Sequence, residues 1–285
     1  MKKYKNGTRN RERVEIKGNP YLHLMNYPMN QIKEDIIYFL YDMRAATTRQ
    51  IIRYTGYSGN YIRSVLRNMY ENRLVHRDFP YIKKRSKPGS GEGVYFLDNQ
   101  GAFFIAANKG LEKKEVNWDP RDNVVSLGAI KHTLDIAEIR VCMENSQEFK
   151  VKEFLGERRL GRISFQYEGG EIVFNPDSKI EILKKLPDGK LAKILLLLEY
   201  DRSTESLKSF AEKIQNYEKF YRSKKINEIF ENIHPAVLIV SNHKTRTEKL
   251  KALVEKTKVE NIKYYFTTLD ENFKNNPFSF LLNEQ

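Results

Sequence analysis

Acidic residues stand at the ends of two apolar segments in the second half of this chain. Asp177 follows Asn175-Pro176 inside one strand-like segment. Glu199 ends the aliphatic run 194–198, and Asp201 follows it two positions later. A carboxylate at the exit of a buried strand is costly to leave desolvated and unpaired, so each needs a partner. Hydrated Mg²⁺ (or Mn²⁺) suits this role because it prefers a few carboxylate oxygens plus water.

Two further side chains are candidates for the same site. Glu138 lies among apolar residues in a predicted helix over 128–145, and it is a candidate additional metal ligand. Lys213 lies on the helix that follows the Glu199 strand, where its ammonium group could reach the carboxylates. Simpler interpretations stay open at this point. Glu138 can be a solvated helix residue, Lys213 can form an ordinary amphipathic pair with Tyr217, and Asp201-Arg202 can be a salt-bridged strand end.

A polar helix face in the first third of the chain suggests a different chemistry, the reading of DNA bases. Residues 58–72 carry Ile62, Leu66 and Met69 at helical spacing, which predicts one buried face. Arginine and asparagine side chains on the other face suit the base edges of a major groove. The candidate DNA-binding residues of this helix are Asn60, Tyr61, Arg63, Ser64, Arg67 and Asn68.

A basic turn follows this helix. Predicted strands over 74–79 and 93–97 flank it, and helices over 31–43, 47–54 and 58–72 precede it. Three helices and then a β-hairpin is the order of a winged helix-turn-helix, whose third helix enters a major groove. A winged helix that binds another protein is the alternative. The candidate DNA-binding residues of the wing are Lys83, Lys84, Arg85 and Lys87.

The distribution of charge favours a DNA partner for this segment. The net charge is +13. Residues 1–120 hold 22 basic against 12 acidic residues, whereas the remainder holds 28 against 25. A basic surplus confined to one part of a chain indicates a polyanion partner there, because each phosphate contact releases counterions. We therefore expect double-stranded DNA to bind the N-terminal third.

Length and element order predict two domains. A chain of 285 residues exceeds the usual size of one domain. We expect a basic, irregular arm over 1–30, an α+β winged helix domain over 31–111, a linker over 112–123 and an α/β domain over 124–285. Helices are predicted in this last domain over 128–145, 204–222 and 246–258. Strands are predicted over 149–155, 162–167, 171–183 (interrupted at Asn175-Pro176), 193–200, 236–241 and 262–267. This alternation predicts a mixed sheet flanked by helices.

Several classes of protein are disfavoured. No apolar run reaches the roughly 18 residues of a membrane span, and no secretory signal follows the basic start. The single cysteine, Cys142, cannot form an internal disulfide, and no Cys/His cluster has zinc spacing. These features predict a cytoplasmic protein without a membrane partner. The five histidines include no His-x-His pair, so a conventional metal-dependent relaxase is poorly supported.

The ordered motifs of the second domain resemble the PD-(D/E)xK nuclease superfamily. More narrowly, residues 30–270 resemble the replication-relaxation family of plasmids and integrative elements. The resemblance implies a restriction-endonuclease-like fold and a role in plasmid replication or in DNA relaxation and transfer. It also implies Mg²⁺-dependent nicking with the catalytic residues Asp177, Glu199, Lys213 and Asp201, of which Asp201 is a candidate further metal ligand. The matching segments are His132-Thr133-Leu134-Asp135, Pro176-Asp177, Glu199-Tyr200-Asp201-Arg202-Ser203-Thr204, Lys213 and Tyr217.

One position departs from the nuclease pattern. Nucleases of the superfamily carry lysine two residues after the glutamate, and this chain has Asp201 there. An acid cannot offset negative charge in the transition state, whereas a lysine can. Lys213 is the candidate to take over that role. The alternative is a non-catalytic regulator or replication accessory with a degenerate nuclease fold, which binds an origin region and uses its second domain to form a homodimer or to contact partners.

Overall fold

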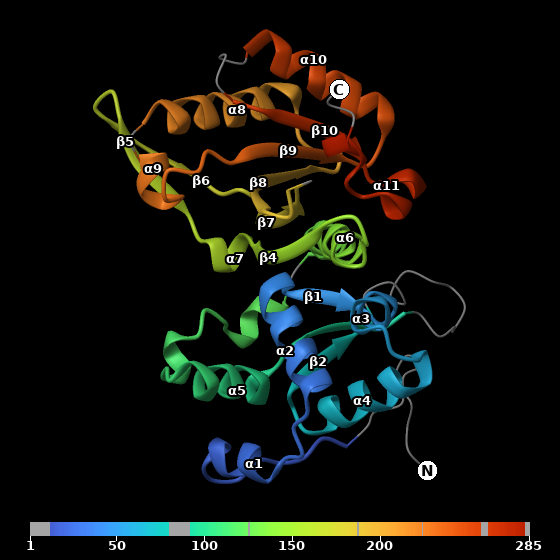
Figure 1. Ribbon diagram of the computed structural model, residues 1–285. Coiled ribbons are helices and arrows are strands. Elements are labelled where there is room, and N and C mark those ends of the chain that lie inside the picture. Colours follow the sequence, from blue (N-terminus) through green and yellow to red (C-terminus); the bar gives the residue numbers. More distant parts are fainter. Residues whose placement is uncertain are drawn as a thin grey trace. The chain divides into compact units, whose positions relative to one another are not determined.

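The computed structural model divides the chain into two compact units, Met1–Glu138 (unit 1) and Ile139–Gln285 (unit 2) (Figure 1). It describes residues 12–79, 92–124, 126–186, 188–223, 225–257 and 262–282. The predicted α+β character and the mixed sheet flanked by helices are confirmed.

The helices of unit 1 begin where side chains can cap them. The Thr47 hydroxyl accepts the N–H of Gln50 while the Gln50 side chain accepts the N–H of Thr47, so this pair starts α3. At the start of α4 the Ser58 hydroxyl accepts the N–H of Tyr61, and Gly56 ends α3 with φ +72°. The predicted third helix over 58–72 is therefore confirmed almost to the residue. The helices are α1 (Pro20–Asn26), α2 (Gln31–Met43), α3 (Thr48–Thr55), α4 (Gly59–Glu71) and α5 (Asn99–Lys109).

The prediction of an irregular arm up to residue 30 was wrong for α1. Asn19 caps this helix and Pro20 stands at its first position, which is a favourable helix start. The preceding residues pack on the same unit, because Arg13 pairs with Asp98 and the N–H of Val14 donates to the carbonyl of Glu71 at 2.8 Å.

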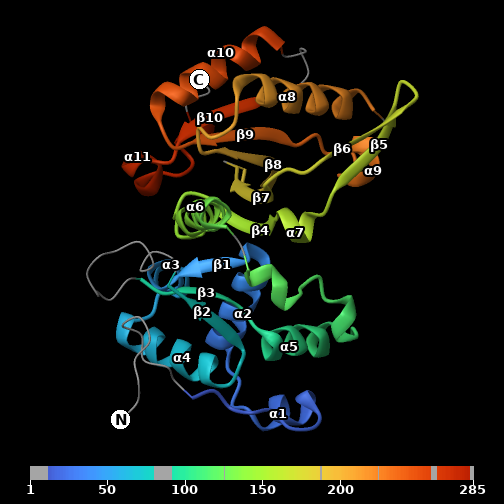
Figure 2. The same ribbon diagram turned by 180° about the vertical axis from the view of Figure 1, so that it is seen from behind.

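A small antiparallel sheet completes the core of unit 1 (Figure 2). It consists of β1 (Ala45–Thr47), β2 (Val75–Asp78) and β3 (Val94–Leu97) in the order β1-β3-β2. Gly101 of α5 approaches this sheet closely, since a Cβ there would lie 2.4 Å from the carbonyl oxygen of Leu74. The predicted wing tip falls in residues 80–91, outside the described residues.

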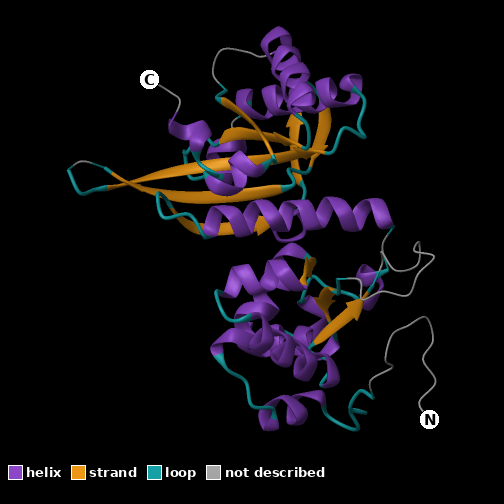
Figure 3. Ribbon diagram, turned by 90° about the vertical axis from the view of Figure 1, so that its right-hand side faces the viewer, coloured by secondary structure: helices purple, strands orange, loops and turns teal. Residues whose placement is uncertain are grey.

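Residues 112–123, predicted as a linker, are packed against unit 1. They form the short 3₁₀ helices η2 (Lys113–Glu115) and η3 (Pro120–Asn123), and Val116 and Trp118 between them are buried. The Asn123 side chain donates to the carbonyl of Leu97 at 2.9 Å. Unit 1 also includes the first two thirds of α6 (Leu127–Glu144), whose Ile130 and Leu134 pack with Ala45, Val94 and Phe96. The division between the compact units therefore falls inside a continuous helix (Figure 3).

Unit 2 is built on a five-stranded mixed sheet in the order β10-β9-β8-β7-β4. β8, β9 and β10 are parallel, β7 pairs antiparallel with β8, and β4 pairs antiparallel with β7. All six residues of β9 are buried, as expected for a central strand. The strands are β4 (Lys150–Gly156), β7 (Ser178–Lys185), β8 (Leu191–Asp201), β9 (Ala236–Ser241) and β10 (Tyr264–Thr268).

The predicted strand over 171–183 is two strands. β6 (Gly170–Phe174) pairs with β5 (Ile163–Tyr167) in a separate hairpin, and β7 starts at Ser178 in the main sheet. The break falls at Asn175-Pro176, because proline has no N–H to donate to a strand ladder.

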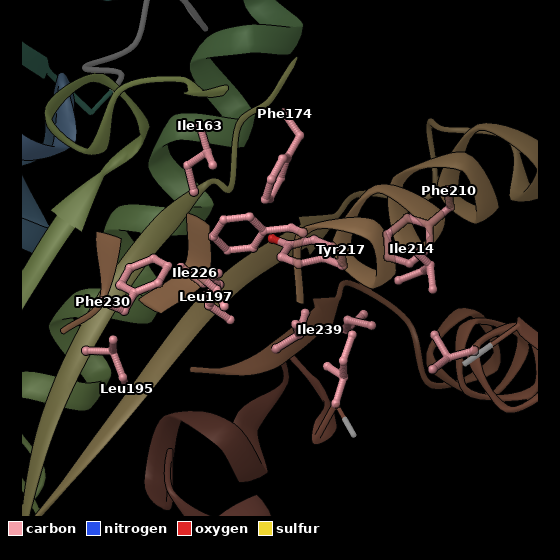
Figure 4. Packing of buried hydrophobic residues seen from close by; sticks show 14 of the residues in the cluster. Ile163, Phe174, Leu195, Leu197, Phe210, Ile214, Tyr217, Ile226, Phe230 and Ile239 are labelled. Atoms are coloured by element: carbon pink, nitrogen blue, oxygen red, sulfur yellow. The ribbon is translucent and has the colours of Figure 1, made fainter. Parts of the chain in front are cut away.

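The longest helices of unit 2 after α6 pack on each other and on the sheet. α8 (Leu207–Arg222) lies beside α10 (Lys244–Thr257), and α10 contacts β9 and β10 (Figures 1 and 2). Figure 4 shows Phe210, Ile214 and Tyr217 of α8 in the cluster that also contains Leu197 and Ile239 of the sheet. The remaining helices are α7 (Glu157–Leu160), α9 (Lys225–Ile229), α11 (Glu271–Asn275) and α12 (Ser279–Leu282). Within the described part of the chain, no helix is long and apolar enough to cross a membrane.

Candidate functional site

The register of β7 and β8 brings the two predicted carboxylates together at one end of the sheet. Ser178 pairs with Leu198, and the N–H of Asp177 donates to the carbonyl of Leu198 at 3.0 Å. One residue further, Asp177 Oδ2 accepts the N–H of Tyr200 at 2.7 Å. Asp177 therefore lies opposite Glu199 across the β7–β8 pair, although 22 residues separate the two in sequence.

Two side chains of α8 contact Glu199. Lys213 Nζ lies 2.9 Å from Glu199 Oε2, and the Tyr217 hydroxyl donates to Glu199 Oε1 at 2.6 Å. Lys213 and Tyr217 are one turn apart, so one helix face presents both groups. Glu199 is only 1% exposed, whereas the Lys213 side chain is 30% exposed and reaches the surface. The predicted proximity of Lys213 to Glu199 is present in the structure.

Burial and charge shift the pKa values of this cluster. The pKa of Glu199 is raised to about 7, mainly by burial; in this balance the charge of Lys213 lowers the pKa and that of Asp177 raises it. Burial alone would lower the pKa of Lys213, but Glu199 and Asp177 raise it well above its ordinary value. Burial, and then Glu199, also raise the pKa of Tyr217, so this hydroxyl remains a hydrogen-bond donor. The cluster thus holds a protonated lysine beside a carboxyl group that ionises near neutral pH.

A third carboxylate, which sequence reasoning missed, completes the surroundings of Lys213. Glu205 Oε2 lies 3.5 Å from Lys213 Nζ, and Glu205 Oε1 accepts the Ser209 hydroxyl at 2.6 Å. Glu205 stands in the loop between β8 and α8, and no periodic pattern singles out a loop residue of this kind. Lys213 therefore bridges a buried carboxylate and a partly exposed one.

Asp201 has a different partner from Glu199, although both belong to β8. Its Oδ2 accepts Nε of Arg246 at 2.6 Å, and its Oδ1 accepts the N–H of Ser203 at 2.7 Å. Asp201 is 3% exposed, so this ion pair is buried at the end of the strand. The arrangement corresponds to the salt-bridged strand end left open by the sequence, with Arg246 of α10 in place of the neighbouring Arg202. The catalytic or metal-binding role of Asp201 stays a prediction.

Glu138 lies in unit 1, where it contacts α3. It forms an ion pair with Arg53 and accepts a hydrogen bond from Gln50 Nε2 at 3.2 Å. Gln50 Nε2 also donates to the carbonyl of Leu134 at 2.7 Å, so these contacts attach the part of α6 that belongs to unit 1 to α3. Its role as a metal ligand stays a prediction.

The predicted DNA-reading face of α4 is open to solvent. Ile62, Val65, Leu66 and Met69 are buried, so the predicted amphipathic pattern is confirmed. The ring of Tyr57, in the turn before the helix, is tilted against the ring of Tyr61 with centroids 5.6 Å apart, and both residues are exposed. All six predicted residues of this face are exposed: Asn60, Tyr61, Arg63, Ser64, Arg67 and Asn68. The wing residues Lys83, Lys84, Arg85 and Lys87 lie outside the described residues.

A hard divalent cation at Asp177 would need several oxygen donors nearby. Among the described residues, no group of three or more His, Cys, Asp or Glu side chains is placed to hold a metal ion. Both Glu199 oxygens are already engaged, by Lys213 and Tyr217. Asn175 Oδ1, two residues before Asp177, is buried and accepts no hydrogen bond. A Mg²⁺ or Mn²⁺ ion at Asp177 and Glu199 stays a prediction, in which the ion would keep most of its water.

Comparison with known proteins identifies the family. The family model described as replication-relaxation matches residues 37–237. The chain belongs to the replication-relaxation family. The match covers α2 to α5 of unit 1 and, in unit 2, the sheet through β8 together with α8. No curated protein and no solved structure matches the chain.

Proposed function

We propose that this member of the replication-relaxation family binds double-stranded DNA through unit 1 and nicks it at the Asp177–Glu199–Lys213 cluster of unit 2. The observation that carries the proposal is the 2.9 Å contact between Lys213 and Glu199, beside Asp177 on the neighbouring strand. It supplies a lysine next to the two carboxylates, although Asp201 occupies the position at which the nuclease superfamily carries lysine. The proposed setting is plasmid replication or DNA relaxation and transfer.

The DNA-binding half of the proposal treats unit 1 as a winged helix-turn-helix. Helices α2, α3 and α4 are followed by β2 and β3, with β1 as the third strand of the sheet. In such a domain α4 enters the major groove, where Arg63 and Arg67 contact base edges or phosphates. The exposed side chains of this face and the basic surplus of residues 1–120 support this role.

The nuclease half treats unit 2 as a restriction-endonuclease-like domain, in which each group of the cluster has a separate task. Asp177 and Glu199 would hold the divalent ion. A bound Mg²⁺ supplies a Lewis acid that polarises the phosphate and lowers the pKa of a coordinated water. The Lys213 ammonium group would stabilise the negative charge that builds on the phosphate during attack. Tyr217, by donating to Glu199, fixes the orientation of this carboxylate.

A DNA-binding accessory without catalytic activity is the second candidate, and a specific observation favours it. Both Glu199 oxygens are engaged and the side chain is 1% exposed. A metal ion could reach this carboxylate only after Lys213 or Tyr217 released one oxygen. In the accessory, the same contacts would form a buried ion pair that stabilises unit 2.

Nicking of supercoiled plasmid carrying the element's own origin distinguishes the two candidates. The full chain is assayed with Mg²⁺, with Mn²⁺ and with a chelator. Asp177→Asn, Glu199→Gln and Lys213→Met should each abolish or strongly reduce nicking while DNA binding, measured by anisotropy, is unchanged. Glu181→Gln is the matched control, because Glu181 is a buried carboxylate of the same sheet that pairs with Lys152 and Lys193.

The double variant Asp177→Asn/Glu199→Gln should lose little more activity than either single variant, because groups that act as a unit are non-additive. A wild-type chain that binds the origin and leaves it uncut with both metals would support the accessory. Loss of nicking in Glu181→Gln equal to that in Glu199→Gln would indicate a general defect of unit 2 and would count against the proposed site.

A further inference from the structure

Arg246 of α10 joins two structures that border the Lys213 cluster. Its Nε pairs with Asp201 at the end of β8, at 2.6 Å. Its Nη2 donates to the main-chain carbonyl of Glu205 at 2.7 Å. The guanidinium is suited to this double contact, because its donors point in fixed, divergent directions that one ammonium group cannot reproduce. One side chain therefore anchors both the start of the β8–α8 loop and its fourth residue.

The same loop is held from the β9–α10 turn by a second residue. The Ser203 hydroxyl donates to Asn242 Oδ1 at 2.8 Å, and Asn242 Nδ2 donates to the carbonyl of Arg202 at 3.2 Å. Ser203 has φ +61°, a left-handed conformation that is unfavourable for serine and needs such support. The loop is thus held in a specific conformation by contacts from a segment about 40 residues further along the chain.

This conformation determines where the Glu205 side chain points. The Glu205 carboxylate lies 3.5 Å from Lys213 Nζ, while the Glu205 carbonyl is held by Arg246. A chain of contacts therefore runs from Arg246 through Glu205 to Lys213 and on to Glu199. Arg246 is 13% exposed and Asp201 1% exposed in their side chains, so this anchor is far more buried than Lys213 itself.

We propose that Arg246 is a positioning residue for the lysine of the candidate nuclease site, acting through Glu205. The inference rests on the proposed function for its catalytic consequence, but the positioning can be measured without it. It also assigns a part to α10, which lies beyond residues 37–237 matched by the family model. The proposal also gives Asp201 a task. Asp201 stands where the nuclease superfamily carries its lysine, and it holds Arg246, which in turn positions Lys213.

The direct test is the reactivity of Lys213 toward an amine-acylating reagent, read by mass spectrometry of the full-length, metal-free protein. A lysine held by two carboxylates reacts slowly, and loosening one of them makes it react faster. Arg246→Met should raise the Lys213 acylation rate by roughly fivefold, the effect of losing a partly exposed ion pair. Exposed Lys208 on the same helix provides the internal reference rate.

Two variants separate positioning from general loosening of unit 2. The variant Glu205→Gln lacks the carboxylate through which Arg246 would act on Lys213. In this variant, adding Arg246→Met should therefore change the rate of Lys213 acylation little. Arg140→Met is the matched control, because Arg140 is another largely buried arginine whose ion pair is with Glu144 of its own helix. It should leave Lys213 acylation unchanged. Arg246→Lys, which can contact Asp201 or the carbonyl but not both, should give an intermediate rate.

Nicking provides the second readout. Misplacing a catalytic group by about 1 Å can cost roughly 100-fold in rate, so Arg246→Met should reduce the turnover rate of nicking by up to this factor while DNA affinity is unchanged. An unchanged Lys213 rate in Arg246→Met, or an equal increase with and without the Glu205 carboxylate, would overturn the positioning role. A wild-type chain that does not nick would count against the proposed function alone, and the acylation rates would still decide the role of Arg246.

Discussion

Removing the positive charge beside Glu199 should destabilise unit 2 in a manner that depends on pH. In the wild-type protein, burial raises the pKa of Glu199 to about 7, and in the unfolded chain this pKa is near 4.5. The folded state therefore binds the proton more tightly, and stability falls as pH rises from about 4.5 to about 7. Above pH 7 Glu199 is ionised and paired with Lys213, whose own raised pKa keeps it protonated through this range.

The variant Lys213→Met lacks the partner that allows ionisation. In the folded variant Glu199 stays protonated above pH 7, whereas in the unfolded chain it ionises. The free energy of unfolding of the variant therefore falls by about 1.4 kcal/mol for each pH unit above 7. Relative to the wild type, we therefore expect the free energy of unfolding of Lys213→Met to change little at pH 5 and to be lower by roughly 3 kcal/mol at pH 9. That value lies at the lower end of the ~3–5 kcal/mol measured when one partner of a buried ion pair is removed.

Urea unfolding between pH 5 and pH 9 measures this difference. Far-UV circular dichroism should be used to follow unit 2, because the single tryptophan, Trp118, lies in unit 1. Lys193→Met is the matched control. Lys193 pairs with Glu181, which also pairs with Lys152. Burial alone would raise the pKa of Glu181, but the two lysines outweigh burial, so this pKa is lowered. The loss in this control should not grow above pH 7. A loss in Lys213→Met that is constant from pH 6 to pH 9 would refute the reasoning.

Three further predictions concern unit 1. Arg63→Ala and Arg67→Ala should each weaken DNA binding by about 1–3 kcal/mol and relax the sequence preference, as measured by anisotropy on matched and scrambled sites. Neutralising the basic residues within 83–87 should weaken binding to all DNA sequences. The slope of log affinity against log salt concentration should fall by about one for each phosphate group that the wing no longer neutralises. An unchanged slope would show that the wing does not contact the DNA. Gly101→Ala should destabilise unit 1 by about 1–3 kcal/mol in urea, because the new Cβ would lie 2.4 Å from a backbone oxygen. A Cβ at Gly128 in α6 would meet only Ser126 Oγ at 4.0 Å, an ordinary contact, so Gly128→Ala should stabilise unit 1 by about 0.5–1 kcal/mol.

Local patterns in the sequence were enough to predict most helices and strands. The capping residues Thr47 and Ser58 and the apolar spacing of α4 act within one or two turns, so they can be recognised without the rest of the chain. The aliphatic run that ends in Glu199 predicted a central buried strand for the same reason, and β8 is that strand. Family membership, too, could be inferred from the order of the motifs.

The tertiary structure alone decided the boundaries that depend on packing. Residues 112–123 are charged and contain Pro120, a composition typical of a linker, yet they are attached to unit 1 through Trp118 and Asn123. Burial of one tryptophan and a few hydrogen bonds depends on residues far away in sequence. Local composition therefore cannot indicate it.

The partners of the acidic residues were likewise decided only by the fold. Glu199 and Asp201 are two positions apart on one strand, so they share a face of the sheet, and nothing in their local sequence distinguishes a reactive carboxylate from a structural one. α8 brings Lys213 to the first, and α10, from 45 residues further along, brings Arg246 to the second. The sequence determined which residue types could form a site at the end of β8. Which carboxylate faces the lysine and which faces the arginine depends on where two helices cross the sheet, and this is a property of packing between distant segments.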